Sequence, residues 1–183
     1  LLGGRGDEIE VGADFGVMDS FDLLIAAVDG AVRQGFKRVK LKFRPGWDVD
    51  MVAAVRGAFP GAVFHIDCNS AYTLADAPMF ERLDRYNLAM IEQPLAHDDL
   101  VDHAKLQRRI RTPVCLDESI TSPDKARQAI ELGAARFINL KPGRVGGITP
   151  ALAIHELARA TDVPCWIGGM LESGIGASAC LAL

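Results

Sequence analysis

Short apolar segments recur about every 25 residues along this chain, and each ends at or beside an ionisable residue. The segments are VKLKF, AVFHID, LAMIE, PVCLD and RFINLK. Their ionisable residues, separated by 25, 25, 25 and 24 positions, are Lys42, Asp67, Glu92, Asp117 and Lys141. A polar turn and a helical stretch follow each segment, which is the pattern of one strand–helix repeat. The repeat therefore predicts a parallel α/β fold.

Seven strands are predicted from the apolar segments, at residues 9–15, 38–43, 63–67, 88–92, 114–117, 136–140 and 165–167. Helices are predicted between them, at residues 21–34, 49–58, 75–84, 98–110, 123–132 and 150–160, with a further helix beginning near Gly174. This alternation is typical of a (β/α)8 TIM-type barrel, and we find no eighth strand to close it. We expect residues 1–183 to form one partial barrel domain. The opening LLGGRGDEIEVG lacks an initiator Met and reads as the interior of a longer protein.

Three of the recurring residues are carboxylates: Asp67, Glu92 and Asp117. In a parallel barrel the carboxyl ends of successive strands converge on one mouth, where clustered carboxylates repel one another unless a divalent cation neutralises them. Oxygen ligands suit Mg²⁺, with Mn²⁺ or another divalent ion as an alternative, whereas zinc would favour His or Cys. No histidine falls in the series, and we interpret His65 as a core residue and His103 as a surface residue. The alternative is three unrelated acidic residues in loops.

The lysines occupy two sides of the predicted mouth. Lys40 and Lys42 share a strand face, because side-chain direction repeats every two residues. Lys141 begins the loop after the sixth strand, on the opposite side. A partly desolvated lysine beside a cation should have a lowered pKa and can act as a general base. Two such lysines could take a proton from one face of a bound ligand and return it to the other; the alternative is surface lysines whose stems cover apolar area.

Composition excludes several classes of protein. The net charge of −4 gives no electrostatic footprint for a nucleic acid. No signal peptide is visible, and no apolar run approaches the roughly 20 residues that span a bilayer. The cysteines show no CxxC pair, and we interpret them as small buried hydrophobes in a reducing cytosol, which predicts a cytoplasmic protein without nucleic-acid or membrane partners. The cysteines are Cys68, Cys115, Cys165 and Cys180.

The motifs together resemble a known family. VKLKF carries a KxK motif, and HIDCN, MIEQP, CLDES, NLKPGRVGG and GGMLESGIG follow it in order. This series resembles the barrel domain of the enolase superfamily, muconate-lactonising subgroup, and is most similar to the o-succinylbenzoate synthase / N-acylamino acid racemase family. The resemblance implies that the three carboxylates bind Mg²⁺, that Lys42 and Lys141 form the acid/base pair, and that Lys40 supports Lys42 electrostatically. Members of that family also carry an N-terminal α+β capping domain, which we expect to be absent from residues 1–183.

The resemblance implies a reaction class as well. A small-molecule carboxylate would lose its α-proton and form a metal-stabilised enediolate. In the synthase reaction, a dehydration in menaquinone biosynthesis, Lys42 would remove the proton and Lys141 would stabilise the intermediate by cation–π attraction. In racemisation both lysines would exchange protons. The open alternatives are a muconate-type cycloisomerase, a dipeptide epimerase, or an inactive fragment that needs a partner chain. We expect a homo-oligomer.

Five further residues are candidates around the site. Asn69 and Glu118 adjoin predicted metal ligands, and we expect them to support those ligands or to make loop hydrogen bonds only. Gly168 and Gly169 are expected to allow close approach of the backbone to the distal group of the substrate. Met170 is expected to line the pocket.

Overall fold

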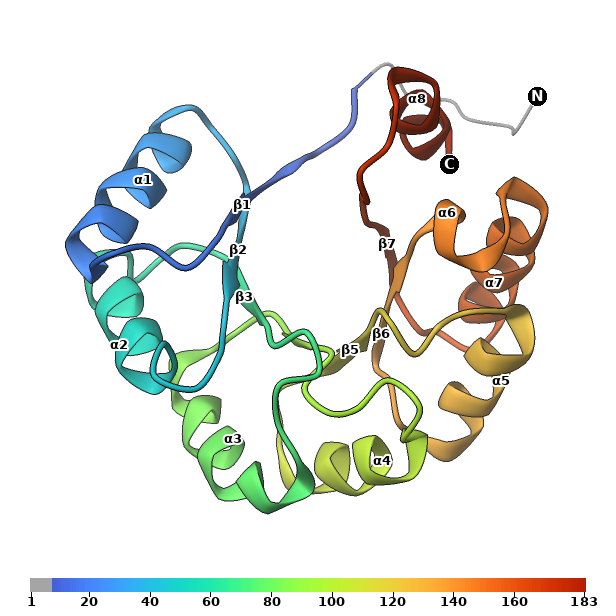
Figure 1. Ribbon diagram of the computed structural model, residues 1–183, viewed down its shortest axis with the longest axis horizontal. Coiled ribbons are helices and arrows are strands. Elements are labelled where there is room, and N and C mark those ends of the chain that lie inside the picture. Colours follow the sequence, from blue (N-terminus) through green and yellow to red (C-terminus); the bar gives the residue numbers. More distant parts are fainter. Residues whose placement is uncertain (1–7) are drawn as a thin grey trace.

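The computed structural model describes residues 8–183, so residues 1–7 of the predicted domain 1–183 lie outside the described part. Seven parallel strands form one sheet in the order β1 to β7, so neighbours in the chain are neighbours in the sheet. Figure 1 shows the sheet curled into an open ring with the helices outside it. The strands are β1 (Gly12–Phe15), β2 (Arg38–Lys42), β3 (Phe64–Asp67), β4 (Ile91–Glu92), β5 (Val114–Leu116), β6 (Phe137–Leu140) and β7 (Cys165–Ile167).

Helices follow the strands along the outside of the ring. They are α1 (Phe21–Arg33), α2 (Val49–Ala58), α3 (Ala77–Leu83), α4 (Leu100–Arg109), α5 (Pro123–Leu132), α6 (Pro142–Val145), α7 (Ile148–Ala160) and α8 (Gly174–Ala182), with 3-10 turns at Leu74–Asp76 and Asp84–Tyr86. No helix in residues 8–183 combines the length and the apolar character that a membrane crossing requires.

Local chemistry explains most element boundaries. Ser122 Oγ accepts the Lys125 amide at 3.2 Å, Pro123 occupies the first turn, and Gly133 ends α5 with a left-handed φ of 67°. Apolar residues three or four apart on α1, namely Leu24, Val28 and Ala31, are buried against the sheet, whereas Leu23 is 55% exposed.

The seven predicted strands are all confirmed, and three details differ by more than one or two residues. Strand β1 begins at Gly12 rather than at residue 9. Strand β4 is only two residues long instead of covering 88–92, because the chain reaches the sheet from a left-handed turn at Asn87, with φ of 51°. The short helix α6 was not predicted within NLKPGRVGG; it begins at Pro142, which suits a first helical position, and ends at Gly146, whose φ is 97°.

The two faces of the sheet differ in chemistry. On β2, Val39 and Leu41 are buried in the hydrophobic core that also contains Val28 and Val52 of the helices. The alternate residues Lys40 and Lys42 face the other way, into the ring. The core thus lies between sheet and helices, and the concave face is left for polar side chains.

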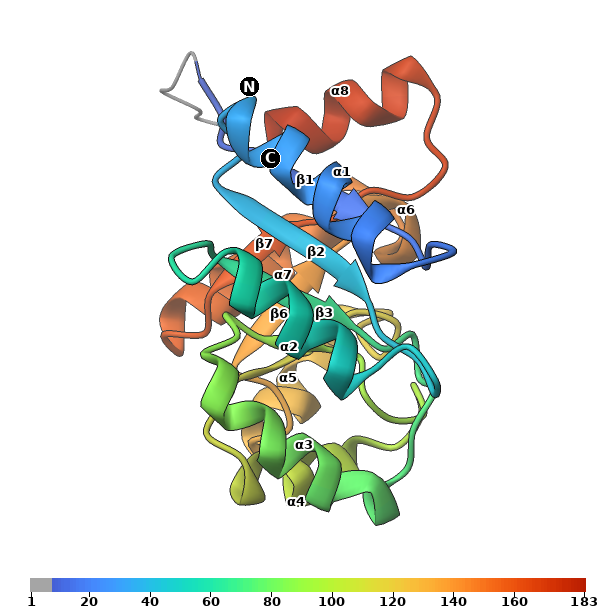
Figure 2. The ribbon, with the colours of Figure 1, turned by 90° about the vertical axis from the view of Figure 1, so that its left-hand side faces the viewer.

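The ring is open between β1 and β7. Among residues 8–183 no strand pairs with the outer edge of either, which confirms the predicted incomplete barrel. A cavity of about 700 Å³ lies on this side, lined by residues of β1, β6, β7 and α8. Figure 2 shows α8 near the β1 end of the molecule, with α3 and α4 at the opposite end. Exposed apolar side chains flank the opening: Ile9, Val11, Leu171, Ile175 and Leu181.

We predict that the 183-residue chain self-associates in water, because unpaired strand edges beside exposed apolar side chains recruit other chains. Light scattering over a concentration series should give masses above the 19.7 kDa of one chain. Val11→Lys should lower the association, because Val11 is 53% exposed beside the open edge. Val101→Lys is the matched control, at 54% exposed on α4. A monodisperse monomer at every concentration would contradict this prediction.

Candidate active site

The carboxyl ends of the strands bring the predicted ionisable residues to one end of the curved sheet. Lys42 pairs with Asp67 across β2 and β3, and Asp67 pairs with Glu92 across β3 and β4. On β5, however, the partner of Glu92 is Cys115, so Asp117 lies two residues further along. Because side-chain direction repeats every two residues, Asp117 still belongs to the concave face. Equal spacing in the sequence therefore does not give equal heights in the sheet, since neighbouring strands of a barrel are staggered.

Lys40 and Lys42 point to the same carboxylate, as their shared strand face predicts. Asp67 Oδ2 lies 2.8 Å from Lys40 Nζ and 2.7 Å from Lys42 Nζ. Lys40 Nζ is also 3.3 Å from Glu92 Oε2. Burial lowers the pKa of Lys40, but the negative charges of Glu92 and Asp67 outweigh burial and raise it. This direction is opposite to the one expected for a lysine in the site, because carboxylates rather than a cation are the neighbours of Lys40.

Glu92 is fully buried and is surrounded by donors. Its Oε1 accepts a 2.6 Å hydrogen bond from Asn139 Nδ2, and its Oε2 lies 3.4 Å from His65 Nε2. Burial raises the pKa of Glu92, but His65, Lys40 and Asn139 outweigh it and lower the pKa to about 2. His65 is buried as predicted, yet neither of its ring nitrogens makes a hydrogen bond. Asn139 was missed in the sequence, although N-x-K on β6 repeats the two-residue spacing of K-x-K.

Asp117 is 1% exposed and contacts two cations. Lys141 Nζ lies 2.9 Å from its Oδ2, and Arg144 of α6 contacts its Oδ1. Burial raises the pKa of Asp117; the Lys141 hydrogen bond opposes this, but Glu118 adds to it, and the pKa is about 6. Arg144 was also missed, because its position depends on the unpredicted helix α6.

Asn69 and Glu118 form a hydrogen-bonded chain with one of the lysines. Lys42 Nζ donates to Asn69 Oδ1 at 2.8 Å, and Asn69 Nδ2 donates to Glu118 Oε1 at 2.9 Å. The Asn69 amide also donates to Asp67 Oδ1 at 3.0 Å. The loop after β3 makes this possible through a left-handed turn, with φ of 43° at Asn69. Both candidates therefore lie beside the predicted ligands.

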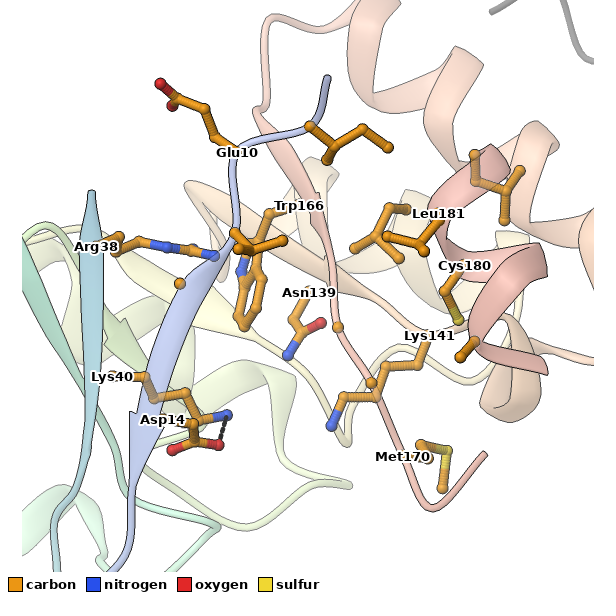
Figure 3. Close-up of a pocket in the computed structure, with 18 of the residues that line it drawn as sticks. Glu10, Asp14, Arg38, Lys40, Asn139, Lys141, Trp166, Met170, Cys180 and Leu181 are labelled. Atoms are coloured by element: carbon orange, nitrogen blue, oxygen red, sulfur yellow. Dashed lines mark ion pairs between the residues drawn. The ribbon is translucent and has the colours of Figure 1, made fainter. Parts of the chain in front are cut away.

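The glycines after β7 line the cavity together with Met170. Figure 3 shows Lys40 of β2 and Lys141 on opposite sides of this cavity, with Asn139 between them and Met170 below. At Gly168 a β-carbon would lie only 2.0 Å from Asn139 Oδ1. The glycine at position 168 therefore leaves space for the Asn139 side chain. From the sequence we expected a different reason, the close approach of the backbone to the substrate.

The three carboxylates suit a divalent cation by their chemistry. Each is at most 1% exposed, and each offers only oxygen donors. The Oε2 atoms of Glu92 and Glu118 are buried without a hydrogen-bond donor. Within the described residues, no three His, Cys, Asp or Glu side chains are grouped to hold one ion as they stand, because lysine and arginine side chains contact the carboxylates. These residues therefore fit Mg²⁺ once the cationic side chains move aside.

Two other sequence interpretations need correction. His103 is fully buried rather than on the surface, and burial lowers its pKa. The four cysteines are free, as expected, but only Cys68 and Cys115 are buried, while Cys165 and Cys180 are partly exposed. His103 and Cys180 lie on helices, and the sequence pattern does not show which helix face another element covers. Cys165 lies in β7, at the open edge of the sheet.

Known proteins with similar sequences and structures show which family has this geometry. Residues 23–183 match the family described as enolase C-terminal domain-like. The chain is 54% identical over 175 residues to an o-succinylbenzoate synthase of Geobacillus kaustophilus, covering 96% of this chain and 47% of that protein. It is 51% identical over 176 residues to an N-succinylamino acid racemase of Thermus thermophilus, covering 96% and 48%. It thus spans about half the length of these relatives.

A solved structure agrees with the sequence matches. The dipeptide epimerase from Cytophaga hutchinsonii, complexed with Mg and the dipeptide D-Ala-L-Val, is 28% identical with a TM-score of 0.89, covering 99% of this chain and 50% of that chain. The strand order, the polar concave face and the match over residues 23–183 lead to one conclusion. The chain belongs to the enolase C-terminal domain-like family, among relatives named o-succinylbenzoate synthase and N-succinylamino acid racemase.

Proposed function

We propose that the protein abstracts the proton α to the carboxylate of a small molecule, acting as an o-succinylbenzoate synthase, an N-acylamino acid racemase, or both. The observation that carries this proposal is the placement of two lysines against buried carboxylates on opposite sides of the ring. Lys42 contacts Asp67 from β2, and Lys141 contacts Asp117 from the end of β6. The relatives named for these two reactions support the choice of substrates.

Asp67, Glu92 and Asp117 would hold the metal ion. The Mg named with the dipeptide epimerase supports this choice, and Mn²⁺ is chemically similar. When bound, the ion supplies positive charge that stabilises the negative charge left when the α-proton departs. The chain contributes the buried oxygen ligands.

Each lysine has a distinct task in the proposal. The side chain of Lys42 is 32% exposed and that of Lys141 is 11% exposed, so Lys42 can exchange its proton with solvent more readily. In water elimination, neutral Lys42 takes the α-proton and returns it to the β-hydroxyl, which leaves as water, while protonated Lys141 stabilises a substrate ring by cation–π attraction. In racemisation, one lysine takes the proton and the other returns a proton to the opposite face. Lys40, 12% exposed between Asp67 and Glu92, stays charged and supports Lys42 electrostatically.

The proposal extends to the whole protein. We propose a cytoplasmic homo-oligomer in which residues 1–183 are part of the barrel domain. Free cysteines support a reducing compartment. A cycloisomerase or a dipeptide epimerase would use the same five residues, and the 28% identity to the epimerase supports that alternative less than 54% supports the synthase.

Replacing Asp117 with Asn tests the metal site. Asp117→Asn should weaken Mg²⁺ binding and abolish activity while the fold remains, because an amide removes the negative charge but keeps the shape. Calorimetric titration with Mg²⁺, alongside circular dichroism, measures both effects. Asp124→Asn is the control, since that side chain is 85% exposed on α5. Unchanged Mg²⁺ affinity in Asp117→Asn would remove Asp117 from the ligand set.

Isotope exchange in the whole protein distinguishes the roles of Lys42 and Lys141. Lys42→Ala should lower both elimination and racemisation by roughly 10²–10⁴-fold, the usual contribution of a general base. Lys141→Arg should lose racemisation but retain some elimination, because guanidinium keeps its charge and rarely deprotonates.

Each single variant should exchange the α-proton of only one enantiomer with deuterated solvent. NMR of deuterium incorporation into separate D- and L-N-succinyl amino acids measures this exchange. Lys105→Arg, a 50% exposed lysine on α4, should behave as the wild type. Equal exchange of both enantiomers by both Lys42→Ala and Lys141→Arg would show that another base acts in the site.

A further inference from the structure

Gln93 occupies an unusual position between Glu92 and Pro94. Its side chain is fully buried, and its backbone is left-handed, with φ of 38°. A residue with a β-carbon is strained in this region and stays there only where its surroundings hold it. Gln93 immediately follows the proposed metal ligand Glu92. The hydrogen bonds that hold Gln93 in place come from the ends of the neighbouring strands β3 and β5.

The backbone of Gln93 connects three strand ends. Its amide donates to the Cys115 carbonyl of β5 at 2.8 Å, and its carbonyl accepts the Ser70 amide from the loop after β3 at 2.8 Å. The strands β3, β4 and β5 are the ones that bring Asp67, Glu92 and Asp117 to the site. The left-handed turn at Gln93 is thus hydrogen-bonded to the strand ends or loops on both sides of β4, from which the other two proposed ligands come.

The side chain of Gln93 holds the start of the next loop. Its Oε1 accepts the main-chain amides of Asp117 at 3.0 Å and Ser119 at 3.1 Å. Its Nε2 donates to Ser119 Oγ at 2.8 Å and to the Leu95 carbonyl at 3.2 Å. Both polar atoms of this buried amide therefore have partners, which is the condition for a buried polar group to fix one geometry.

His103 supports the same arrangement from α4. Its Nε2 accepts the Leu95 amide at 3.2 Å, so its Nδ1 carries the proton and donates to the Asp99 carbonyl at 2.6 Å. His103 Nε2 also lies 3.5 Å from Gln93 Nε2. The buried neutral imidazole thus braces the Leu95 segment to which Gln93 donates.

We infer that Gln93 is a positioning residue for the candidate metal site: it fixes the main chain of Asp117 relative to Glu92, and so sets the spacing of two ligands. The metal-binding part of this inference rests on the proposed function. The effect of Gln93 on the Asp117 backbone does not depend on it. Gln93 itself contacts no reacting atom in this scheme and acts through Asp117.

The chain contains a matched control for this inference. Gln107 is also a buried glutamine, at 3% exposed, and it also holds an amide of β5. Its Oε1 accepts the Val114 amide at 2.6 Å, and its Nε2 lies 3.3 Å from the carbonyls of Ile110 and Thr112. Gln107 hydrogen-bonds to the amino end of β5, whereas Gln93 hydrogen-bonds to the main chain just after its carboxyl end. Loss of either amide should destabilise the fold, but only Gln93 should affect the ligands.

The experiment compares Gln93→Met with Gln107→Met in the whole protein. Hydrogen exchange by NMR reports the protection of individual amides, and electron paramagnetic resonance of free Mn²⁺ reports metal affinity. Gln93→Met should lose protection at Asp117 and Ser119 and weaken Mn²⁺ binding by roughly 10–100-fold, the range for groups that orient metal ligands. Gln107→Met should lose protection at Val114 and keep the wild-type Mn²⁺ affinity.

Several outcomes would overturn the inference. Wild-type protection of Asp117 and Ser119 in Gln93→Met would do so, and so would equal weakening of Mn²⁺ binding in both variants, which would indicate general destabilisation. If Gln93→Met does not fold, Ser119→Ala replaces it, because this change removes one partner of the Gln93 amide. Ser119→Ala should shift both readouts in the same direction by less, and no shift would count against the inference.

Failure of the proposed metal site gives a different result. In that case the wild-type chain and Asp117→Asn would bind Mn²⁺ equally weakly. The exchange of the Asp117 amide in Gln93→Met would still decide whether Gln93 positions that backbone.

Discussion

Negative charge buried on the concave face of the sheet is the constraint on which the rest of the site depends. Asp67, Glu92 and Asp117 are each at most 1% exposed. A buried carboxylate is costly unless it is paired and hydrogen-bonded. The cations Lys40, Lys42 and Lys141 supply that pairing, together with Arg144. Four cations therefore meet three carboxylates and Glu118 in one small region.

The same constraint explains why two buried carboxylates have opposite pKa shifts. Burial raises the pKa of both Glu92 and Asp117. At Glu92 the neighbouring His65, Lys40 and Asn139 outweigh burial, and the pKa is about 2. At Asp117 the negative charge of Glu118 adds to burial, and the pKa is about 6 despite Lys141. The balance of neighbouring charges, rather than burial alone, sets the direction.

Neutral amide side chains fix the geometry that the charges require. Asn139 donates to Glu92, Asn69 links Lys42 to Glu118, and Gln93 accepts the amide of Asp117. An amide can donate and accept at once without changing the net charge of the site. Gly168 belongs to this system because only a residue without a β-carbon leaves space for Asn139. Asn139 and Gln93 are themselves buried, whereas Asn69 lies at the exposed rim of the site.

Local sequence patterns were enough to predict the repeat and its chemistry. Seven parallel strands, the shared face of Lys40 and Lys42, and the family follow from local patterns, because alternation and capping act over a few residues. Roles for the five recurring residues remain predictions. Three features became visible only in the folded chain: Asp117 lies two residues beyond the partner of Glu92, His103 is buried, and Gly168 leaves space for Asn139. Contacts such as Asn139 with Glu92 join residues 47 positions apart, so they depend on strand stagger, which no local pattern in one sequence encodes.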